Sequence, residues 1–224
     1  MSDGFIIKRG GSGGSGGGVD PSIIERTATN VTADMLNGVT SIGSYAFYQC
    51  SSLTSITIPN GVTSIGNYAF SGCGSLTSIE IPNGVTSIGN DAFYHCTSLT
   101  SITIPNGVTS IGNSAFNDCT NLASVTIPNG VTSIGNYAFS GCGSLTSIEI
   151  PNGVTSIGNN VFYYCSSLTS ITVKATTPPT LGSNVFYGTY SSLVIYVPAE
   201  SVDAYKAATN WSNYASKIQA IPSD

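Results

Sequence analysis

Six cysteines and a single histidine are the side chains best suited to metal binding or nucleophilic chemistry in this 224-residue sequence. The cysteines recur at positions 50, 73, 96, 119, 142 and 165, and His95 directly precedes one of them. A zinc site needs several closely spaced ligands, and nucleophilic catalysis needs a base beside the nucleophile. Because the sequence offers neither, we predict a chain without a catalytic site, a metal site or a cofactor.

Disulfides are also disfavoured, although the six cysteines are evenly spaced. If the repeats stack, equivalent cysteines of neighbouring repeats lie about 5 Å apart with parallel Cα–Cβ bonds. A disulfide needs Cβ atoms about 3.8 Å apart. We therefore expect a ladder of buried free thiols.

At one position of the repeat, Glu replaces Thr in two copies, and we interpret this position as the outward face of a strand. Its members are Thr57, Glu80, Thr103, Thr126, Glu149 and Thr172. The two Glu are three repeats apart, or about 14 Å at the usual strand spacing. Glycosidases pair carboxylates at roughly 5–9.5 Å, so this face is a candidate binding surface, with strand support by threonine ladders as the alternative.

Tyrosines occupy a second set of variable positions, in the turns away from this strand. Exposed Tyr among small polar residues is typical of interfaces, although some of these rings could simply pack over the core. The candidate binding residues in the turns are Tyr45, Tyr48, Tyr68, Tyr94, His95, Tyr137, Tyr163 and Tyr164.

A 23-residue repeat must position all of these side chains. Phe, Cys, Leu and Ile each recur six times at this spacing. One repeat cannot bury its own apolar residues, whereas stacked repeats bury them as ladders of identical side chains. We predict a solenoid of mainly short parallel β-strands with turns and 3₁₀ or short helical segments, ending in a helical C-terminal cap.

Each repeat divides into short segments with different roles. Residues 79–81, Ile-Glu-Ile, alternate as a strand does, and Pro82–Gly84 has turn composition. Residues 85–88 form a second short extended or 3₁₀ segment. Residues 92–96 bring Ala, Phe and Cys together, and we predict one helical turn there.

Two stretches of the repeat region have the same sequence. Residues 57–90 and 126–159 are identical over 34 positions, at an offset of 69, which is three whole repeats. The sequence indicates duplication of a three-repeat block, which a solenoid tolerates because the core register is kept.

The ends of the chain depart from the repeat and define three parts. Residues 1–18 are a flexible tag and Gly/Ser linker. Residues 19–198 are the solenoid with its N-terminal capping turn, in which Val31 and Ala33 replace the paired Ile and Ser22 and Glu25 fit a capping box. Residues 199–224 are the helical cap: a helix is expected at 199–208, followed by an apolar patch of Trp211, Tyr214 and Ile218.

Charge is sparse and negative in the repeat region. The net charge is −5, and residues 27–173 contain no Lys or Arg. Nucleic-acid binding needs basic residues to neutralise phosphates, so we expect no nucleic-acid partner. The sequence has no apolar run long enough to span a membrane, and Phe5–Ile7 is too short for a signal-peptide core. We expect a monomer.

The repeated pattern Leu-x-x-Ile-x-Ile-Pro-x-x-Val-x-x-Ile-Gly-x-x-Ala-Phe-x-x-Cys, over residues 29–198, resembles the BspA-type leucine-rich repeats of bacteria. It departs from the general leucine-rich-repeat consensus, because Gly84 holds the offset where an Asn or Cys is usual. The resemblance implies a cell-surface or secreted protein that adheres to matrix proteins or other cells. Similar repeats occur in phage-tail-associated proteins.

These observations predict a non-catalytic module that recognises a protein or glycan ligand, as an adhesin-like surface protein. The alternative is a structural display rod, such as a phage-tail-associated protein.

Overall fold

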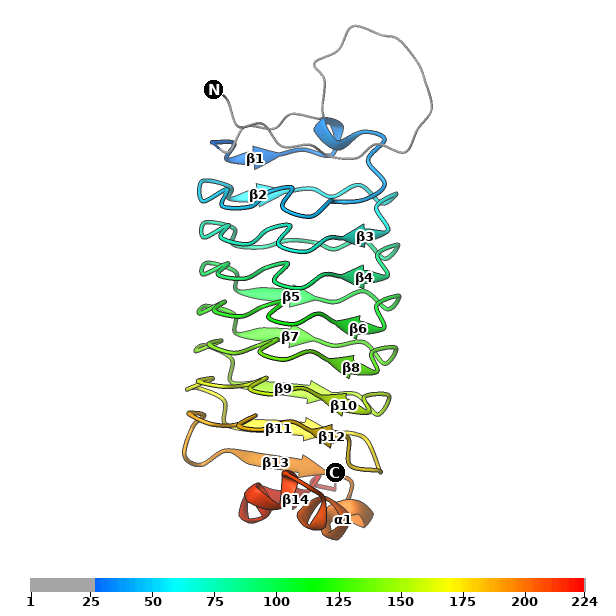
Figure 1. The fold of residues 1–224 in the computed structure, drawn as a ribbon, viewed down its shortest axis with the longest axis vertical. Helices are drawn as coiled ribbons and strands as arrows, with labels where there is room; N and C mark the ends of the chain where they lie inside the picture. The colour runs from blue at the N-terminus through cyan, green and yellow to red at the C-terminus, as the bar shows by residue number, and fades with distance from the viewer. Residues whose placement is uncertain (1–26, 224) are drawn as a thin grey trace, which may run out of the picture.

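The structure is a computed structural model in which residues 27–223 are described, so the expected linker at 1–18 and the capping box at Ser22 and Glu25 lie outside the described residues. The chain winds into coils stacked along one axis, as Figure 1 shows. Along the sequence, each coil consists of two stretches that carry short strands and one stretch of tight turns. The predicted solenoid of short parallel strands is confirmed. No helix among the described residues is long and apolar enough to cross a membrane.

The first side of each coil, here called the strand face, carries the apolar–polar alternation. Its strands pair in parallel as β1–β2, as β5–β7 and as a four-stranded sheet in the order β14-β13-β11-β9. Inward Ile residues alternate with outward polar residues, as in β9, where Ile148 and Ile150 are buried. The strands are β1 (Asn30–Val31), β2 (Ser55–Ile56), β5 (Ser101–Thr103), β7 (Ser124–Thr126), β9 (Ser147–Ile150), β11 (Ser170–Val173), β13 (Val194–Val197) and β14 (Ile218–Ala220).

The second side is one continuous six-stranded parallel sheet, in the order β12-β10-β8-β6-β4-β3. Each strand has two residues because Gly follows it and the chain then turns. The close approach of the coils requires that Gly: a Cβ at Gly89 would lie 2.6 Å from both the backbone nitrogen and Oδ1 of Asn67. The strands are β3 (Ser64–Ile65), β4 (Ser87–Ile88), β6 (Ser110–Ile111), β8 (Ser133–Ile134), β10 (Ser156–Ile157) and β12 (Thr180–Leu181).

The third side, here called the turn edge, corrects the prediction of a helical turn at 92–96. It consists of consecutive tight turns in which two residues per coil have positive φ, such as Asp91 (54°) and His95 (58°). Alternate N–H groups bond within the coil and to the next coil. Cys50 donates to the Phe47 carbonyl (3.2 Å), whereas Phe47 donates to the Ala69 carbonyl of the next coil (2.7 Å). This alternation pairs the backbone N–H groups of the turn edge without a helix.

The core consists of ladders of identical side chains. The Phe rings stack nearly parallel through the molecule, from Phe47 and Phe70 (5.1 Å between centroids) to Phe162 and Phe186 (5.9 Å). The six repeated Phe residues are fully buried. Stacked aromatic rings at this separation add to the hydrophobic free energy of burial, so each coil stabilises its neighbours.

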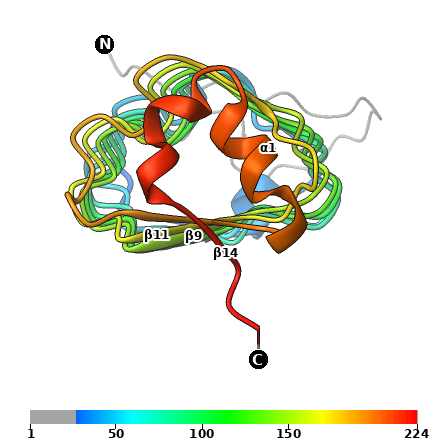
Figure 2. The same ribbon diagram turned by 90° about the horizontal axis from the view of Figure 1, so that it is seen from below.

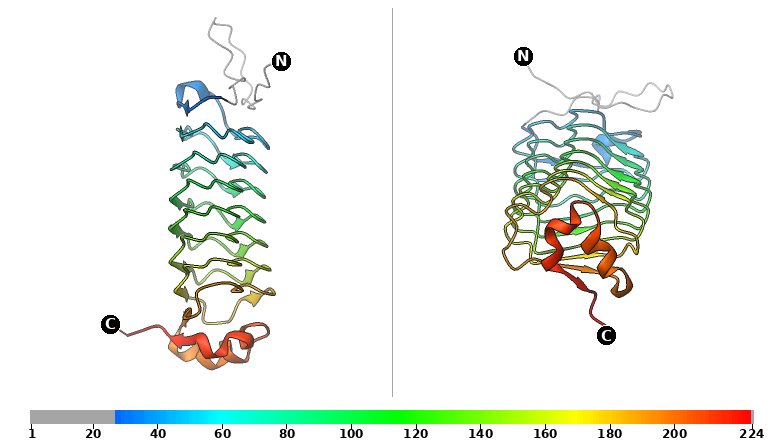
Figure 3. Two further views of the ribbon diagram at one scale, coloured as in Figure 1. Left: turned by 90° about the vertical axis from the view of Figure 1, so that its left-hand side faces the viewer. Right: turned by 60° about the horizontal axis from the view of Figure 1, so that its bottom comes forward.

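Both ends of the core are covered. At the start, the short 3₁₀ helix η1 (Asp34–Leu36) buries Leu36. At the other end, η2 (Ala199–Ser201), α1 (Val202–Ala207) and η3 (Trp211–Lys217) lie across the last coil, as Figures 2 and 3 show. The predicted helix at 199–208 is therefore present, and strand β14 is an addition that the sequence did not indicate.

Hydrogen bonds fix this C-terminal cap to the last coil. The buried Trp211 indole donates to the Pro179 carbonyl (2.8 Å), and the buried Tyr205 hydroxyl donates to the Ala175 carbonyl (2.8 Å). Burial of Tyr and Trp is favourable when their polar atoms find such partners. The cap is thus specific to this end of the solenoid.

Candidate functional site

The cysteines form a buried structural ladder. None of the six is joined in a disulfide, and the Cys96 thiol, for example, donates to the Phe70 carbonyl (3.1 Å). Burial raises the pKa of Cys96 and of Cys165 to about 12, so both remain neutral and unreactive at physiological pH. Residues 27–223 contain no cluster of His, Cys, Asp or Glu able to hold a metal ion.

The structure brings the strand-face candidates together in pairs. Thr57 lies opposite Glu80, Thr103 opposite Thr126, and Thr172 opposite Glu149. All six are exposed or half-buried. The face is therefore a column of accessible hydroxyls with two carboxylates.

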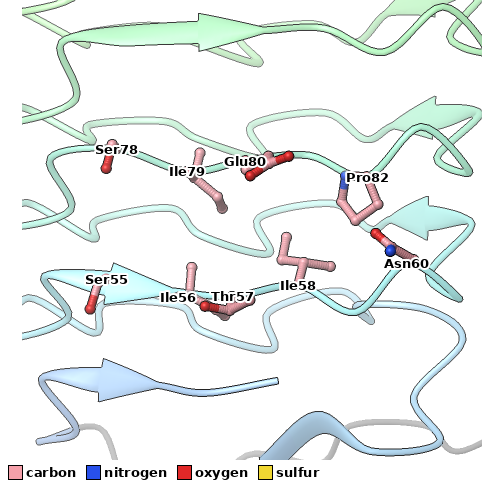
Figure 4. Close-up of a pocket in the computed structure, with 9 residues that line it drawn as sticks. All are labelled: Ser55, Ile56, Thr57, Ile58, Asn60, Ser78, Ile79, Glu80 and Pro82. Carbon is pink, nitrogen blue, oxygen red and sulfur yellow. The ribbon is translucent and has the colours of Figure 1, made fainter. Parts of the chain in front are cut away.

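A groove separates two coils where this face is least regular. It measures about 400 Å³ and lies between residues 55–60 and 78–82. Figure 4 shows Ser55 to Ile58 along one coil and Ser78 to Pro82 along the next, with Asn60 near Pro82. Three Ile residues line it together with Ser, Thr, Asn and Pro residues, and Glu80 contributes the one acidic group of its lining.

The second Glu has a basic neighbour. Lys174 Nζ lies 3.3 Å from Glu149 Oε2, with 42% and 63% of the two side chains exposed. This is the only salt bridge found within residues 27–223. An exposed pair contributes less than about 1 kcal/mol, so it has a minor effect on stability, but it neutralises one of the two strand-face carboxylates.

The turn edge carries three variable residues per coil, and these form three columns along the molecule. The first and third columns are the positive-φ positions, and the second lies between them. All eight candidate turn residues fall in these columns. The first column is Tyr45, Tyr68, Asp91, Ser114, Tyr137, Asn160 and Asn184; the second is Tyr48, Ser71, Tyr94, Asn117, Ser140, Tyr163 and Tyr187; the third is Gln49, Gly72, His95, Asp118, Gly141, Tyr164 and Gly188.

The first aromatic group, here called the N-terminal aromatic cluster, comprises Tyr45, Tyr48 and Tyr68. The rings of Tyr45 and Tyr68 stack with centroids 4.9 Å apart and planes 6° apart. The ring of Tyr48 is nearly perpendicular to both, at 77° and 83°. The third-column neighbour Gly72 leaves room for Gln49, whose Cγ would be 3.3 Å from a Cβ at that position.

A second group, here called the C-terminal aromatic cluster, comprises Tyr163, Tyr164 and Tyr187. Tyr163 stacks with Tyr187 at 5.2 Å, and Tyr164 is nearly perpendicular to Tyr163 at 4.6 Å. The Tyr164 ring lies over Gly188, where a Cβ would be 2.8 Å from its Cδ1. The sequence prediction missed Tyr187, because one inserted residue makes its spacing from Tyr163 24 instead of 23.

The remaining turn candidates are more isolated. Tyr94 and His95 are neighbours with centroids 5.8 Å apart. Tyr137 is 43% exposed, between coils that carry Ser114 and Asn160 in its column. Asp91 was not among the predicted candidates, although it follows Tyr68 in the first column and its carboxylate lies close enough to raise the pKa of the Tyr68 hydroxyl.

Known proteins support this architecture. The BspA-type leucine-rich-repeat region, in six copies, matches residues 27–105 and 86–213. No curated protein matches the chain. Among solved structures, the leucine-rich-repeat protein TpLRR of T. pallidum is 34% identical with a TM-score of 0.68, over 75% of this chain and 78% of that one.

A leucine-rich-repeat protein of Bacteroides ovatus is 31% identical with a TM-score of 0.59. The match covers 77% of this chain but spans only 56% of the Bacteroides protein. The repeat pattern, the family match across most of the described residues and these two structures agree. The chain therefore belongs to the BspA-type leucine-rich-repeat family.

Proposed function

We propose that this protein is a non-catalytic recognition module, adhesin-like and displayed at the cell surface or secreted, that binds a protein or glycan ligand through its turn edge. The observation that carries the proposal is the placement of Tyr45, Tyr68, Tyr137 and Tyr164 at positive φ. Three of these rings, those of Tyr45, Tyr137 and Tyr164, are among the most exposed large hydrophobic side chains of the described residues.

Positive φ is costly for a residue with a Cβ, at about 1–2 kcal/mol. Gly takes the positions equivalent to Tyr164, at Gly72, Gly141 and Gly188 in the third column. The first column, which holds the other three Tyr, has the smaller Asp91, Ser114, Asn160 and Asn184 in its other coils, so the fold does not require an aromatic residue at either position. Strain of this kind is typically found where a side chain is needed for function. Tyr is also the residue that interfaces favour, because its ring is large, rigid and amphipathic.

The aromatic clusters strengthen this interpretation. Both expose Tyr rings whose conformations are fixed by neighbouring rings at 4.6–5.5 Å. A ring that is held in place before binding loses little conformational entropy when a ligand arrives. Recognition of a partner is also what we infer from membership of the BspA-type leucine-rich-repeat family.

Binding to an array of glycans and matrix proteins tests the proposal. The test variant replaces Tyr45, Tyr68, Tyr137 and Tyr164 with Gly, which relieves backbone strain and so preserves the fold. The matched control is Glu80→Thr with Glu149→Thr, which restores the Thr of the other coils. We expect the Tyr variant to lose binding and the Glu variant to keep it.

The opposite result, loss of binding in the Glu variant alone, would show that the ligand binds the strand face instead of the turn edge. If no arrayed ligand binds the unmodified protein at micromolar concentration, the display rod becomes the better explanation. Circular dichroism and thermal unfolding of each variant establish that the coils remain intact.

A further inference from the structure

The N-terminal aromatic cluster differs from the C-terminal one in having a carboxylate beside it. Tyr45 and Tyr68 stack at 4.9 Å in the first column, and Asp91 follows Tyr68 in that column on the next coil. The Asp91 carboxylate raises the pKa of the Tyr68 hydroxyl, mainly by its charge and then by accepting a hydrogen bond from it. The negative charge is thus at the rim of the aromatic cluster.

This carboxylate has no basic partner in the described part of the chain. The only salt bridge there joins Lys174 and Glu149, on the strand face. Asp91 is partly desolvated, and this burial raises its pKa, an effect that the hydrogen bond from Tyr68 only partly offsets. A positive charge that approaches a partly buried carboxylate stabilises its ionised form.

The wider charge distribution also favours a cation. Residues 27–173 hold five acidic residues, Asp34, Glu80, Asp91, Asp118 and Glu149, and no Lys or Arg. A positively charged partner therefore meets no like charge over this part of the molecule, and long-range attraction steers it toward the solenoid.

Aromatic faces next to a carboxylate are the chemistry that recognises ammonium and guanidinium groups. A cation within about 6 Å of a Tyr centroid is attracted by the ring quadrupole, and a carboxylate accepts charge-assisted hydrogen bonds from it. Tyr45 is 53% exposed, so a ligand can reach the cluster.

We propose that Tyr45, Tyr48, Tyr68 and Asp91 form a binding site for Lys or Arg side chains on a basic segment of a partner protein. The proposal rests on the proposed function, because it names the partner class for one end of the turn edge. The C-terminal aromatic cluster, which has no acidic residue on the turn edge of its own coils, does not share this specificity.

The identical sequence block supplies internal controls. Tyr137 is the copy of Tyr68, but Asn160 stands where Asp91 does, and Ser114 stands where Tyr45 does. The same backbone and the same Tyr are thus present once with the carboxylate and stacked ring and once without them. Asp118, in the third column, provides a second acidic residue on the turn edge that lies outside the cluster.

The test is a titration of the purified protein with a fluorescent peptide of alternating Lys and Ser, compared with the same peptide carrying Gln for Lys. Fluorescence anisotropy reports affinity, and tyrosine-ring NMR signals report which rings are contacted. We expect the Lys peptide to bind, to shift the Tyr45 and Tyr68 signals and to weaken with added salt. The Gln peptide should bind at least about fivefold more weakly.

Two variants separate a specific site from general attraction to an acidic surface. Asp91→Asn and Asp118→Asn each remove one negative charge, but only the first removes the carboxylate of the proposed site. We expect Asp91→Asn and Tyr45→Gly each to weaken binding by about fivefold to tenfold, and Asp118→Asn to change it by less than about twofold.

Equal loss in Asp91→Asn and Asp118→Asn, or equal binding of the Lys and Gln peptides, would overturn the cation site. In either case the proposed function would stand if the four Tyr→Gly substitutions still abolished binding of an arrayed ligand. If the array shows no ligand but the Lys peptide still binds as expected, the proposed function would be contradicted and the cation site would be retained.

Discussion

Residues 57–90 and 126–159 have the same sequence but do not adopt the same structure on the strand face. In the second copy, Ser147–Ile150 forms the four-residue strand β9, paired with β11 through all four residues. In the first copy, the equivalent residues 78–81 form only an isolated bridge between Glu80 and Thr57. Identical residues thus form a full strand in one coil and an open groove in the other.

One cause of the difference lies in the coil that follows each copy. The Lys174 N–H donates to the Ile150 carbonyl at 2.9 Å and extends the ladder. The equivalent residue after the first copy is Pro105, which has no N–H to offer the Ile81 carbonyl. Lys174 also brings its ammonium group to Glu149, whereas Glu80 has only Thr and Pro at the corresponding positions. The neighbouring coil therefore decides whether the last carbonyl of the strand, that of Ile150 or Ile81, receives a hydrogen bond.

Removing one Phe from each copy should have the largest effect. Phe70 stacks at 5.1 and 5.2 Å between its neighbours, and Phe139 at 5.4 and 5.8 Å. Both are fully buried, so Phe70→Ala and Phe139→Ala should each cost about 3–5 kcal/mol of unfolding free energy. Urea unfolding measures this. A difference above about 2 kcal/mol between the two variants would show that the two cores are not equivalent.

Exchange of the Pro and Lys should alter the strand face itself. Lys174→Pro removes the hydrogen bond to Ile150 and the ion pair, and should cost about 1–2 kcal/mol. Pro105→Lys should protect the amide at position 105 from hydrogen exchange by supplying the missing donor. The control Lys174→Ala keeps the N–H and should cost less than Lys174→Pro. Equal losses in these two variants would attribute the difference to the side chain.

The carboxylates of the two copies should differ by a smaller amount. Glu149→Gln removes the ion pair with Lys174 and should lower stability by less than about 1 kcal/mol. Glu80→Gln should change it by less, because the described structure gives Glu80 no salt bridge. Thermal unfolding with and without added salt compares them. A larger effect of Glu80→Gln would point to a partner for Glu80 that the described structure does not show.

The smallest expected effect concerns pH on the turn edge. Burial raises the pKa of Asp91 in the folded protein, so the folded state binds this proton more tightly than the unfolded state does. The carboxylate is therefore destabilising above its raised pKa, and this cost disappears as the pH falls to the unfolded value of about 3.9. Asp91→Asn should be the more stable protein at pH 7, with the difference closing toward about pH 4.

Thermal unfolding of both proteins across this pH range measures the effect. Asn160→Asp is the matched control, because it introduces the same carboxylate beside Tyr137 in the second copy. A difference that widens as the pH falls would contradict the assignment.

The core was readable from the sequence because its signal is local and repeated. The spacing of Phe47 and its counterparts identified the interior, and the prediction of a buried cysteine ladder without disulfides is confirmed. The cap at 199–208 was also predicted, from a change of pattern. The prediction of a helical turn at 92–96 was wrong, because the spacing of the apolar residues there suits both a helix and a pair of tight turns.

The sequence alone therefore determined the period, the inward residues and the stacking of coils, because 23-residue periodicity places each apolar side chain against its own copies in the adjacent coils. Only the tertiary structure decided what happens at the surface. It joined Tyr187 to Tyr163 and Tyr164 across an insertion, placed Asp91 beside a stacked Tyr pair, and let Lys174 complete a strand that Pro105 leaves open. These outcomes depend on which groups meet between coils, a relation that no single repeat contains.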